Sequence, residues 1–113
     1  LLAALENGVS RVEDVQGRFP QVSGMSFVFD AGKEAGSRVE EVMVGGVPLD
    51  LDKVYSLATN NYVLGGGDGY SSLANGNVLV DGDAGKLLAS TVIDYVTNAG
   101  TVAPAVEGRI VQK

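Results

Sequence analysis

The hydrophobic residues at the start of the chain recur at helical spacing. Apolar side chains stand mostly three or four positions apart up to Val12, as expected for the buried face of an amphipathic helix. These residues are Leu1, Leu2, Leu5, Val9 and Val12. The pattern predicts a helix from the start of the chain to about Val12, although Gly8 lowers the helical propensity. The segment Gly17-Arg18-Phe19-Pro20 then interrupts the pattern.

Two β-strands are predicted by the residues that follow. Large apolar side chains alternate with other residues in the segment 25–29, which predicts a strand with one strongly apolar face. A second β-prone run covers residues 39–44. The apolar positions are Met25, Phe27 and Phe29 in the first run, and Val39, Val42 and Val44 in the second.

A glycine pair marks the next turn. Gly45-Gly46 separates the second run from Val47-Pro48-Leu49, which predicts a β-hairpin with Pro48 at an edge or strand end. The β-prone segment Val54–Thr59 then predicts a further strand that leads directly into a glycine-rich loop. Functional residues often lie where a rigid element presents such a loop.

The clearest helical pattern lies near the end of the chain. Asp83 is a typical N-cap, and Gly100 is suited to the position just after the helix. One apolar stripe is expected along the helix, formed by Leu87, Leu88, Val92, Tyr95 and Val96. We expect Tyr95 and the earlier Tyr55 to lie in the core with their hydroxyls at the surface. A loop with Pro104 and a final strand at residues 107–111 complete the chain.

These elements predict a single α+β domain over residues 1–113, built on one mixed β-sheet with packed helices. A net charge of −6 with scattered Lys and Arg residues disfavours binding to a nucleic-acid backbone. Cysteine and histidine are absent, which removes thiolate ligands, the commonest transition-metal ligand and the usual general base. No apolar run approaches the roughly 20 residues that a membrane-spanning helix needs. A self-contained metal or triad enzyme is therefore disfavoured.

The candidate functional residues lie in the glycine-rich loop between Asn60 and Tyr70. Three consecutive glycines allow positive φ angles and a close approach to the backbone. Tyr62 offers an apolar ring face on one side, and Asp68 offers a hydrogen-bond acceptor on the other. A ligand with sugar-type hydroxyl groups would suit these residues. The loop taken alone slightly favours a second interpretation, in which it is a structural turn and Asp68 caps local amides.

Other motifs carry less weight. The glycine run lacks the Lys-Ser/Thr pair of a phosphate-binding P-loop, and Asp68 would repel phosphate. Asp81-Gly82-Asp83 imitates the start of a calcium loop, but Val92 stands where the closing glutamate is required. We expect a weak surface ion pair between Glu107 and Arg109.

Taken together, four blocks of sequence resemble the C-terminal domain of the 5′-nucleotidase and UDP-sugar hydrolase family. The resemblance spans the whole chain, and the order and spacing of the blocks make it specific. The blocks are Leu2–Ser10, Phe19–Gly24, Asn61-Tyr62 with Gly66–Tyr70, and Pro104–Ile110. A Tyr stands at position 62, where relatives usually carry Phe.

The resemblance implies a nucleoside-binding role for this chain. In the family, an N-terminal metallophosphoesterase domain with two divalent metal ions hydrolyses nucleotides to nucleosides and phosphate. The C-terminal domain binds the nucleoside and determines substrate specificity. The resemblance places the stacking aromatic at Tyr62 and the nucleoside-binding carboxylate at Asp68. Asn61, Gly66 and Gly67 complete the expected substrate-binding residues, and no catalytic or metal-ligating residue is expected here.

The second aromatic and the phosphate-binding arginines of the family belong upstream of the blocks found here. The resemblance therefore implies a partial domain that is inactive alone, from a periplasmic, secreted or cell-surface enzyme, with the N-terminal domain as its partner. We also expect the chain to self-associate through an uncovered apolar face. An alternative is a non-catalytic interaction or structural module derived from this domain. An autonomous hydrolase that uses Asp68 with Tyr70 is disfavoured, since no base or nucleophile stands nearby.

Overall fold

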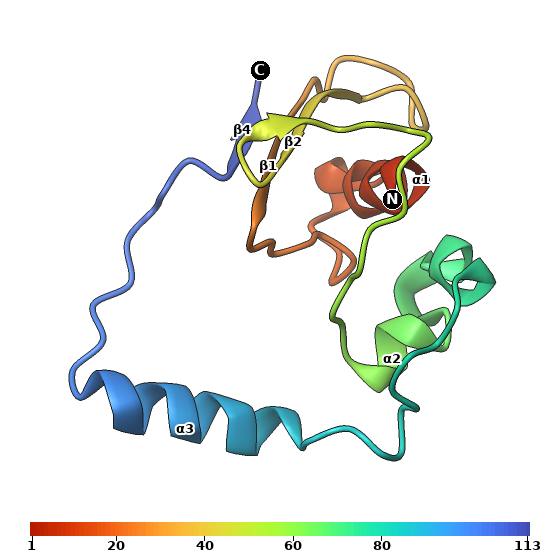
Figure 1. Ribbon diagram of the computed structural model, residues 1–113. Coiled ribbons are helices and arrows are strands. Elements are labelled where there is room, and N and C mark those ends of the chain that lie inside the picture. Colours follow the sequence, from red (N-terminus) through yellow and green to blue (C-terminus); the bar gives the residue numbers. More distant parts are fainter.

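A four-stranded mixed sheet forms the organising layer of the protein. In the computed structural model, which describes all residues 1–113, the strand order is β3-β2-β1-β4. The pairs β1–β2 and β2–β3 are antiparallel, whereas β4 lies parallel to β1 (Figure 1). The strands are β1 (Met25–Phe29), β2 (Val39–Val44), β3 (Val47–Pro48) and β4 (Ile110–Gln112). The predicted α+β class with a mixed sheet is confirmed.

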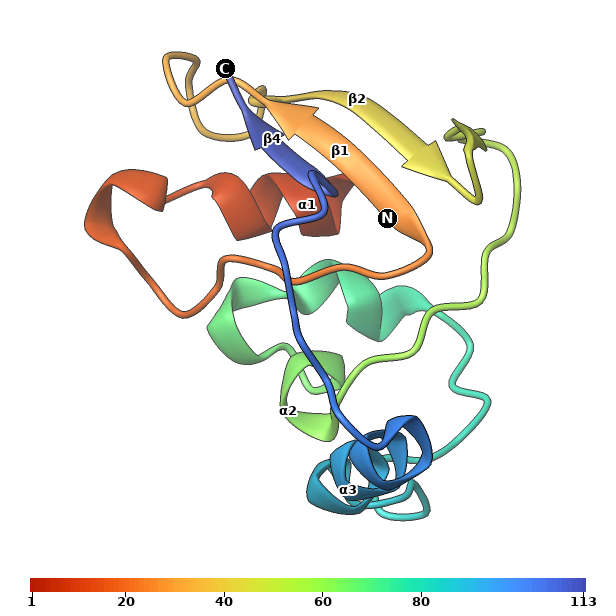
Figure 2. The ribbon, with the colours of Figure 1, turned by 90° about the vertical axis from the view of Figure 1, so that its left-hand side faces the viewer.

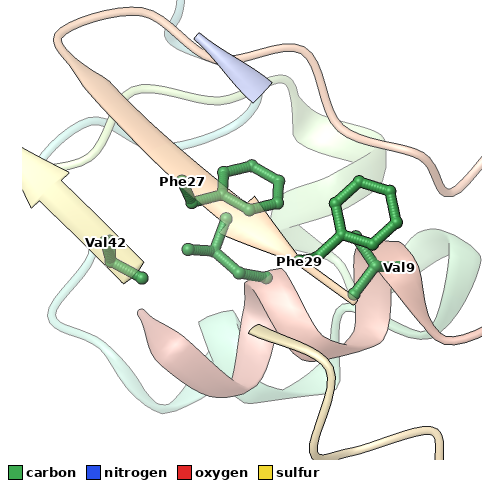
Figure 3. Close-up of a cluster of buried hydrophobic side chains, with 5 residues drawn as sticks. Val9, Phe27, Phe29 and Val42 are labelled. Atoms are coloured by element: carbon green, nitrogen blue, oxygen red, sulfur yellow. The ribbon is translucent and has the colours of Figure 1, made fainter. Parts of the chain in front are cut away.

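The hydrophobic core lies between this sheet and helix α1 (Leu2–Val9). Figure 3 shows Phe27 and Phe29 of β1 and Val42 of β2 gathered against Val9 of the helix. Leu5 completes the buried cluster. The helical spacing of Leu5 and Val9 and the alternation in β1 thus bury one face of each element, as predicted. The helix ends at Val9, and a short 3₁₀ turn (Val12–Asp14) follows, so the helix is shorter than predicted.

A β-bulge in β2 explains why its apolar residues are not spaced by two throughout. Val28 pairs with Glu41, but the next residue, Phe29, pairs with Val39, so Glu40 has no partner in the ladder. The extra residue lets both Val39 and Val42 contact the core. The side chain of Glu40 instead bonds Lys33, with a distance of 2.7 Å between Oε1 and Nζ, and it also bonds Lys113.

The hairpin between β2 and β3 has the predicted geometry. Gly45 and Gly46 have φ angles of 59° and 82°, which is the left-handed conformation required by the tight turns that match strand twist. Pro48 lies on the edge strand β3, where its missing amide hydrogen costs no ladder bond. Both predictions for this segment are confirmed.

A buried arginine connects the sheet to the helix. Arg38 is only 6% exposed, and its guanidinium donates to the carbonyl oxygens of Val9, at 2.7 Å, and Lys33, at 2.9 Å. It also forms an ion pair with Glu13, which lowers the pKa of that carboxyl group. The carboxylate of Glu6 accepts hydrogen bonds from the backbone amides at positions 38 and 39. Together these bonds connect α1 and the turn after it to the start of β2.

The predicted strand at Val54–Thr59 is wrong. These residues have no regular secondary structure, and Val54 is 93% exposed. A strand forms only beside a hydrogen-bonded neighbour, and this segment pairs with neither edge strand of the sheet, β3 nor β4. Tyr55 is half-buried rather than part of the core, and its hydroxyl oxygen accepts a hydrogen bond from the amide of Asp50.

The last helix, α3 (Leu88–Ala99), differs from the prediction at its start and in its packing. Asp83 is not its N-cap, because the carboxylate of Asp81 accepts the Asp83 amide in a local turn that ends before the helix begins. Gly100 follows the helix with φ 74°, as predicted. Helix α3 lies far from the sheet (Figures 1 and 2), and no residue of α3 is buried. Tyr95 is 67% exposed, so its predicted place in the core is wrong.

No helix has both the length and the apolar character needed to cross a lipid bilayer.

Candidate functional site

A short helix presents the aromatic residue of the candidate site. Helix α2 (Asn61–Leu64) is preceded by Asn60, whose side-chain oxygen accepts a 2.8 Å hydrogen bond from the amide of Val63. This is the N-capping bond that Asn commonly makes. The helix leaves Tyr62 with 59% of its surface exposed. A predicted loop is therefore partly helical, and its first turn fixes the position of the ring.

The glycines carry the chain from α2 into a 3₁₀ turn, η2 (Gly67–Gly69). Gly66 has φ 90° and Gly69 has φ 83°, and both values favour glycine. Asp68 lies between them and is itself left-handed, with φ 52° and ψ 25°. The turn reverses the chain and directs it back toward α2.

The reversal brings Tyr62 and Asp68 together. The hydroxyl of Tyr62 donates a hydrogen bond to Oδ1 of Asp68 at 3.0 Å. The ring also lies against Gly67, since a Cβ atom there would be 2.5 Å from Cε1 of the tyrosine. Gly67 is therefore required for the ring to take this position. An ionised carboxylate has further lone pairs, so Asp68 can still accept hydrogen bonds from a ligand.

The remaining predicted site residues flank this pair. Gly66 is half-buried and supplies the left-handed turn that precedes Gly67. Asn61 is exposed and lies close to the backbone at Gly82, where an added Cβ would be 3.1 Å from the Cβ of Asn61. Tyr62, Gly67 and Asp68 thus form one contact unit, with Asn61 at its margin.

The Tyr62–Asp68 pair lies on an open surface. Both side chains are exposed, and the open hollow beside α1 does not include them. That hollow is lined by Leu2, Ala3, Glu6, Asn7, Ser10, Ala35 and Gly36. The pair therefore provides one wall against which a flat ligand can lie.

Tyr70 and Asn7 support the glycine-rich loop, and the sequence did not predict this role for either residue. Tyr70 is buried, and its hydroxyl donates to the carbonyl oxygen of Arg18 at 2.6 Å. Burial, followed by the nearby charge of Asp68, raises the pKa of Tyr70. Asn7 of α1 donates from Nδ2 to the backbone carbonyl oxygen of Asp68 at 3.0 Å. The sequence carried one signal of this packing, a glycine inside a helix at position 8.

The acidic residues do not form a metal site. No group of three or more Asp or Glu side chains is arranged to hold an ion. The resemblance assigns the two-metal centre to the N-terminal domain, not to this chain. The carboxylate of Asp81 accepts a hydrogen bond from the amide of Asp83 in a local turn. Glu107 and Arg109 form the predicted surface pair at 3.1 Å.

Comparison with known protein families identifies the domain. Residues 1–75 match the family model described as "5′-nucleotidase, C-terminal domain". The chain belongs to this family. It is similar to the crystal structure of a 5′-nucleotidase precursor from Thermus thermophilus, with a TM-score of 0.91 and 44% sequence identity over 98% of the chain. The predicted family and fold are therefore confirmed.

Sequence relatives of this 5′-nucleotidase C-terminal domain are longer proteins. A snake venom 5′-nucleotidase from Gloydius brevicauda is 37% identical over 98% of the chain, which covers 20% of that protein. A trifunctional nucleotide phosphoesterase from Bacillus subtilis is 38% identical over 95% of the chain and 8% of its own length. The chain likewise covers 22% of the Thermus protein. It thus spans about a fifth or less of these relatives.

Proposed function

We propose that this chain is part of the nucleoside-binding, substrate-specificity domain of a metal-dependent 5′-nucleotidase, which hydrolyses nucleotides to nucleosides and phosphate. The observation that carries the proposal is the unit of Tyr62, Gly67 and Asp68 in a member of the 5′-nucleotidase C-terminal domain family. An aromatic ring and a carboxylate side by side match the two parts of a nucleoside, a flat base and a hydroxyl-bearing sugar.

In this proposal the two side chains have separate tasks. The base stacks on the exposed ring of Tyr62, a contact worth roughly 1–3 kcal/mol. Asp68 accepts hydrogen bonds from sugar hydroxyls, and the tyrosine hydroxyl holds its carboxylate in place. The binding energy orients the nucleotide so that its phosphate meets the catalytic centre in a productive geometry.

We assign the hydrolytic chemistry to an N-terminal metallophosphoesterase domain of the same polypeptide. The residues of this chain provide neither a metal-binding cluster nor a combination of base and nucleophile. Two divalent ions bound in the partner domain would activate the attacking water. The isolated 113-residue chain should therefore release no phosphate from nucleotides.

The proposal is tested in the complete polypeptide that carries this domain. Asp68→Ala and Tyr62→Ala should each raise KM for nucleotides about tenfold, which corresponds to about 1.4 kcal/mol, without a change in bound metal. Tyr62→Phe keeps the stacking face and should be milder. Asp52→Ala, which removes an exposed carboxylate outside the glycine loop, should not change KM. Unchanged phosphate release kinetics in both alanine variants would refute the assignment.

We also propose a periplasmic, secreted or cell-surface location for the parent protein. The venom 5′-nucleotidases among the relatives support this part of the proposal. Detection of the parent in the cytoplasmic fraction alone would contradict it.

One observation favours the alternative of a non-catalytic module. Tyr62 and Asp68 are hydrogen-bonded to each other on an open surface, so the polar groups of both side chains have a hydrogen-bond partner without a ligand. Calorimetric titration of the parent with adenosine separates the two hypotheses. Binding that is lost in Asp68→Ala supports the nucleoside site, whereas the absence of any nucleoside binding supports the module.

A further inference from the structure

Asp68 has a left-handed backbone conformation, which few residues other than glycine adopt. Only two non-glycine residues in the chain have a positive φ angle, and Asp68 is one of them, with φ 52°. Aspartate tolerates this region better than most residues other than glycine, and surrounding contacts can stabilise it there. The direction of the Asp68 carboxylate depends on this backbone conformation.

The contact that holds the backbone comes from the first helix. Asn7 donates from Nδ2 to the carbonyl oxygen of Asp68 at 3.0 Å, across 61 positions of sequence. Its other amide atom, Oδ1, accepts from Arg18 at 3.5 Å, and Arg18 also donates to the hydroxyl of Ser10 at 3.1 Å. Both the nitrogen and the oxygen of the Asn7 side-chain amide therefore have a hydrogen-bond partner, and the two bonds fix its orientation. Its helix is in turn fixed to the sheet by the buried side chains of Leu5 and Val9.

The residue after Asp68 fits closely against the same side chain. A Cβ atom on Gly69 would lie 2.7 Å from Oδ1 of Asn7, and Gly69 is also left-handed, with φ 83°. The loop thus meets Asn7 at two consecutive residues, once by a hydrogen bond and once by close packing. The hydrogen bond from Tyr70 to the carbonyl oxygen of Arg18 gives a second attachment just beyond.

We propose that Asn7 is a positioning residue for nucleoside binding: it holds the backbone of Asp68 so that the carboxylate faces the Tyr62 hydroxyl and the bound sugar. This inference rests on the proposed function. Asparagine suits the position because it combines a donor for the Asp68 carbonyl with an acceptor for the Arg18 guanidinium. An aspartate of nearly the same size would direct an oxygen at that carbonyl and lose the donor.

The test uses the complete polypeptide with Asn7→Ala, Asn7→Asp, Asp68→Ala and the double variant Asn7→Ala/Asp68→Ala. Each Asn7 variant should raise KM for nucleotides about three- to tenfold, the size of one lost hydrogen bond, with little change in kcat. The double variant should resemble Asp68→Ala, because Asn7 acts through Asp68. Asn98→Ala, which changes an exposed asparagine on α3, should leave KM unchanged.

A phosphate monoester without a nucleoside, p-nitrophenyl phosphate, distinguishes positioning from a merely structural role. Its hydrolysis should be unchanged in the Asn7 variants, whereas general damage to the protein would reduce it. Unchanged nucleotide KM in the Asn7 variants, with KM raised in Asp68→Ala, would overturn this inference and leave the proposed function intact. Unchanged KM in Asp68→Ala would also overturn the inference, whereas unchanged KM in both Asp68→Ala and Tyr62→Ala would refute the proposed function. Loss of folding in both Asn7 variants would assign Asn7 a general structural role and overturn the inference.

Discussion

The hydroxyl oxygen of Tyr70 lies 2.8 Å from the point that a Cβ atom on Gly8 would occupy. The Cδ atom of Pro20 lies 2.7 Å from the same point. Gly8 is therefore the position at which Tyr70 and Pro20 come close to the backbone of α1. Glycine lowers the helical propensity of α1, but it leaves the space that this close approach requires.

Replacing Gly8 with alanine should destabilise the protein although alanine is the better helix former. We expect the free energy of unfolding to fall by about 1–3 kcal/mol, the usual effect of overpacking, in urea denaturation. Gly76→Ala serves as the control, since its Cβ would meet its closest neighbour at an ordinary 3.5 Å. Equal stability of the two variants would contradict the packing argument.

Arg38 should be worth far more to stability than an exposed arginine. Arg38→Met leaves the carbonyl oxygens of Val9 and Lys33 without their buried donor, and should lower the free energy of unfolding by about 2–3 kcal/mol. Arg11→Met breaks an exposed pair with Asp14 and should cost about 0–0.5 kcal/mol. Urea denaturation of both variants measures the two losses in free energy of unfolding. Similar losses would refute the argument that burial makes the hydrogen bonds of Arg38 more stabilising.

Glu40 should make stability depend on acid pH. Hydrogen bonds from Lys113 and Lys33 lower its pKa from an ordinary value of 4.5 to about 2 in the folded protein. Its contribution to stability is therefore fully present above pH 4.5 and lost as pH falls toward 2. Glu40→Gln should destabilise the protein at neutral pH and have little effect at about pH 2.

Thermal unfolding of Glu40→Gln against pH measures this effect. Glu34→Gln is the control, because Glu34 is exposed and makes no side-chain hydrogen bond or ion pair in the structure. A destabilisation of Glu40→Gln that persists unchanged at about pH 2 would exclude the ionic explanation.

The exposed face of α3 should promote self-association of the 113-residue chain. Leu88, Val92 and Val96, which share one face of the helix, are 65%, 53% and 38% exposed, and Tyr95 lies on the same face. Light scattering should show a concentration-dependent increase in mass, which Val92→Lys should reduce. Asn98→Lys adds the same charge at a polar position of α3 and should have a smaller effect. A monomer at all concentrations would contradict the prediction.

The sequence predicted those elements whose signals are local. The alternation of Phe27 and Phe29, the Gly45-Gly46 turn and the Leu5–Val9 spacing each depend on neighbours a few residues away. Segment 54–59 has the composition of a strand, but a strand also needs a partner, and composition carries no information about that.

The candidate site was predictable only in part for the same reason. Tyr62 and Asp68 are six positions apart around glycines, so their proximity follows from local chain reversal. The bond from Asn7 to Asp68 spans 61 positions and depends on how α1 packs beneath the loop. Similarly, the bulge at Glu40 is defined by how β2 pairs with β1. The spacing of valines in β2 suggests an irregularity but does not locate the bulge.

Strand β4 pairs in parallel with β1, although the two come from opposite parts of the chain (Figure 2). During synthesis, residues 110–112 leave the ribosome after every other element described here. Until then β1 has a neighbour on one side only, and its open edge can pair with other nascent chains. Pairing between such distant segments is also slow to form. We therefore expect completion of the sheet to be a late step in folding, and β1 to present an open edge to misassembly until then.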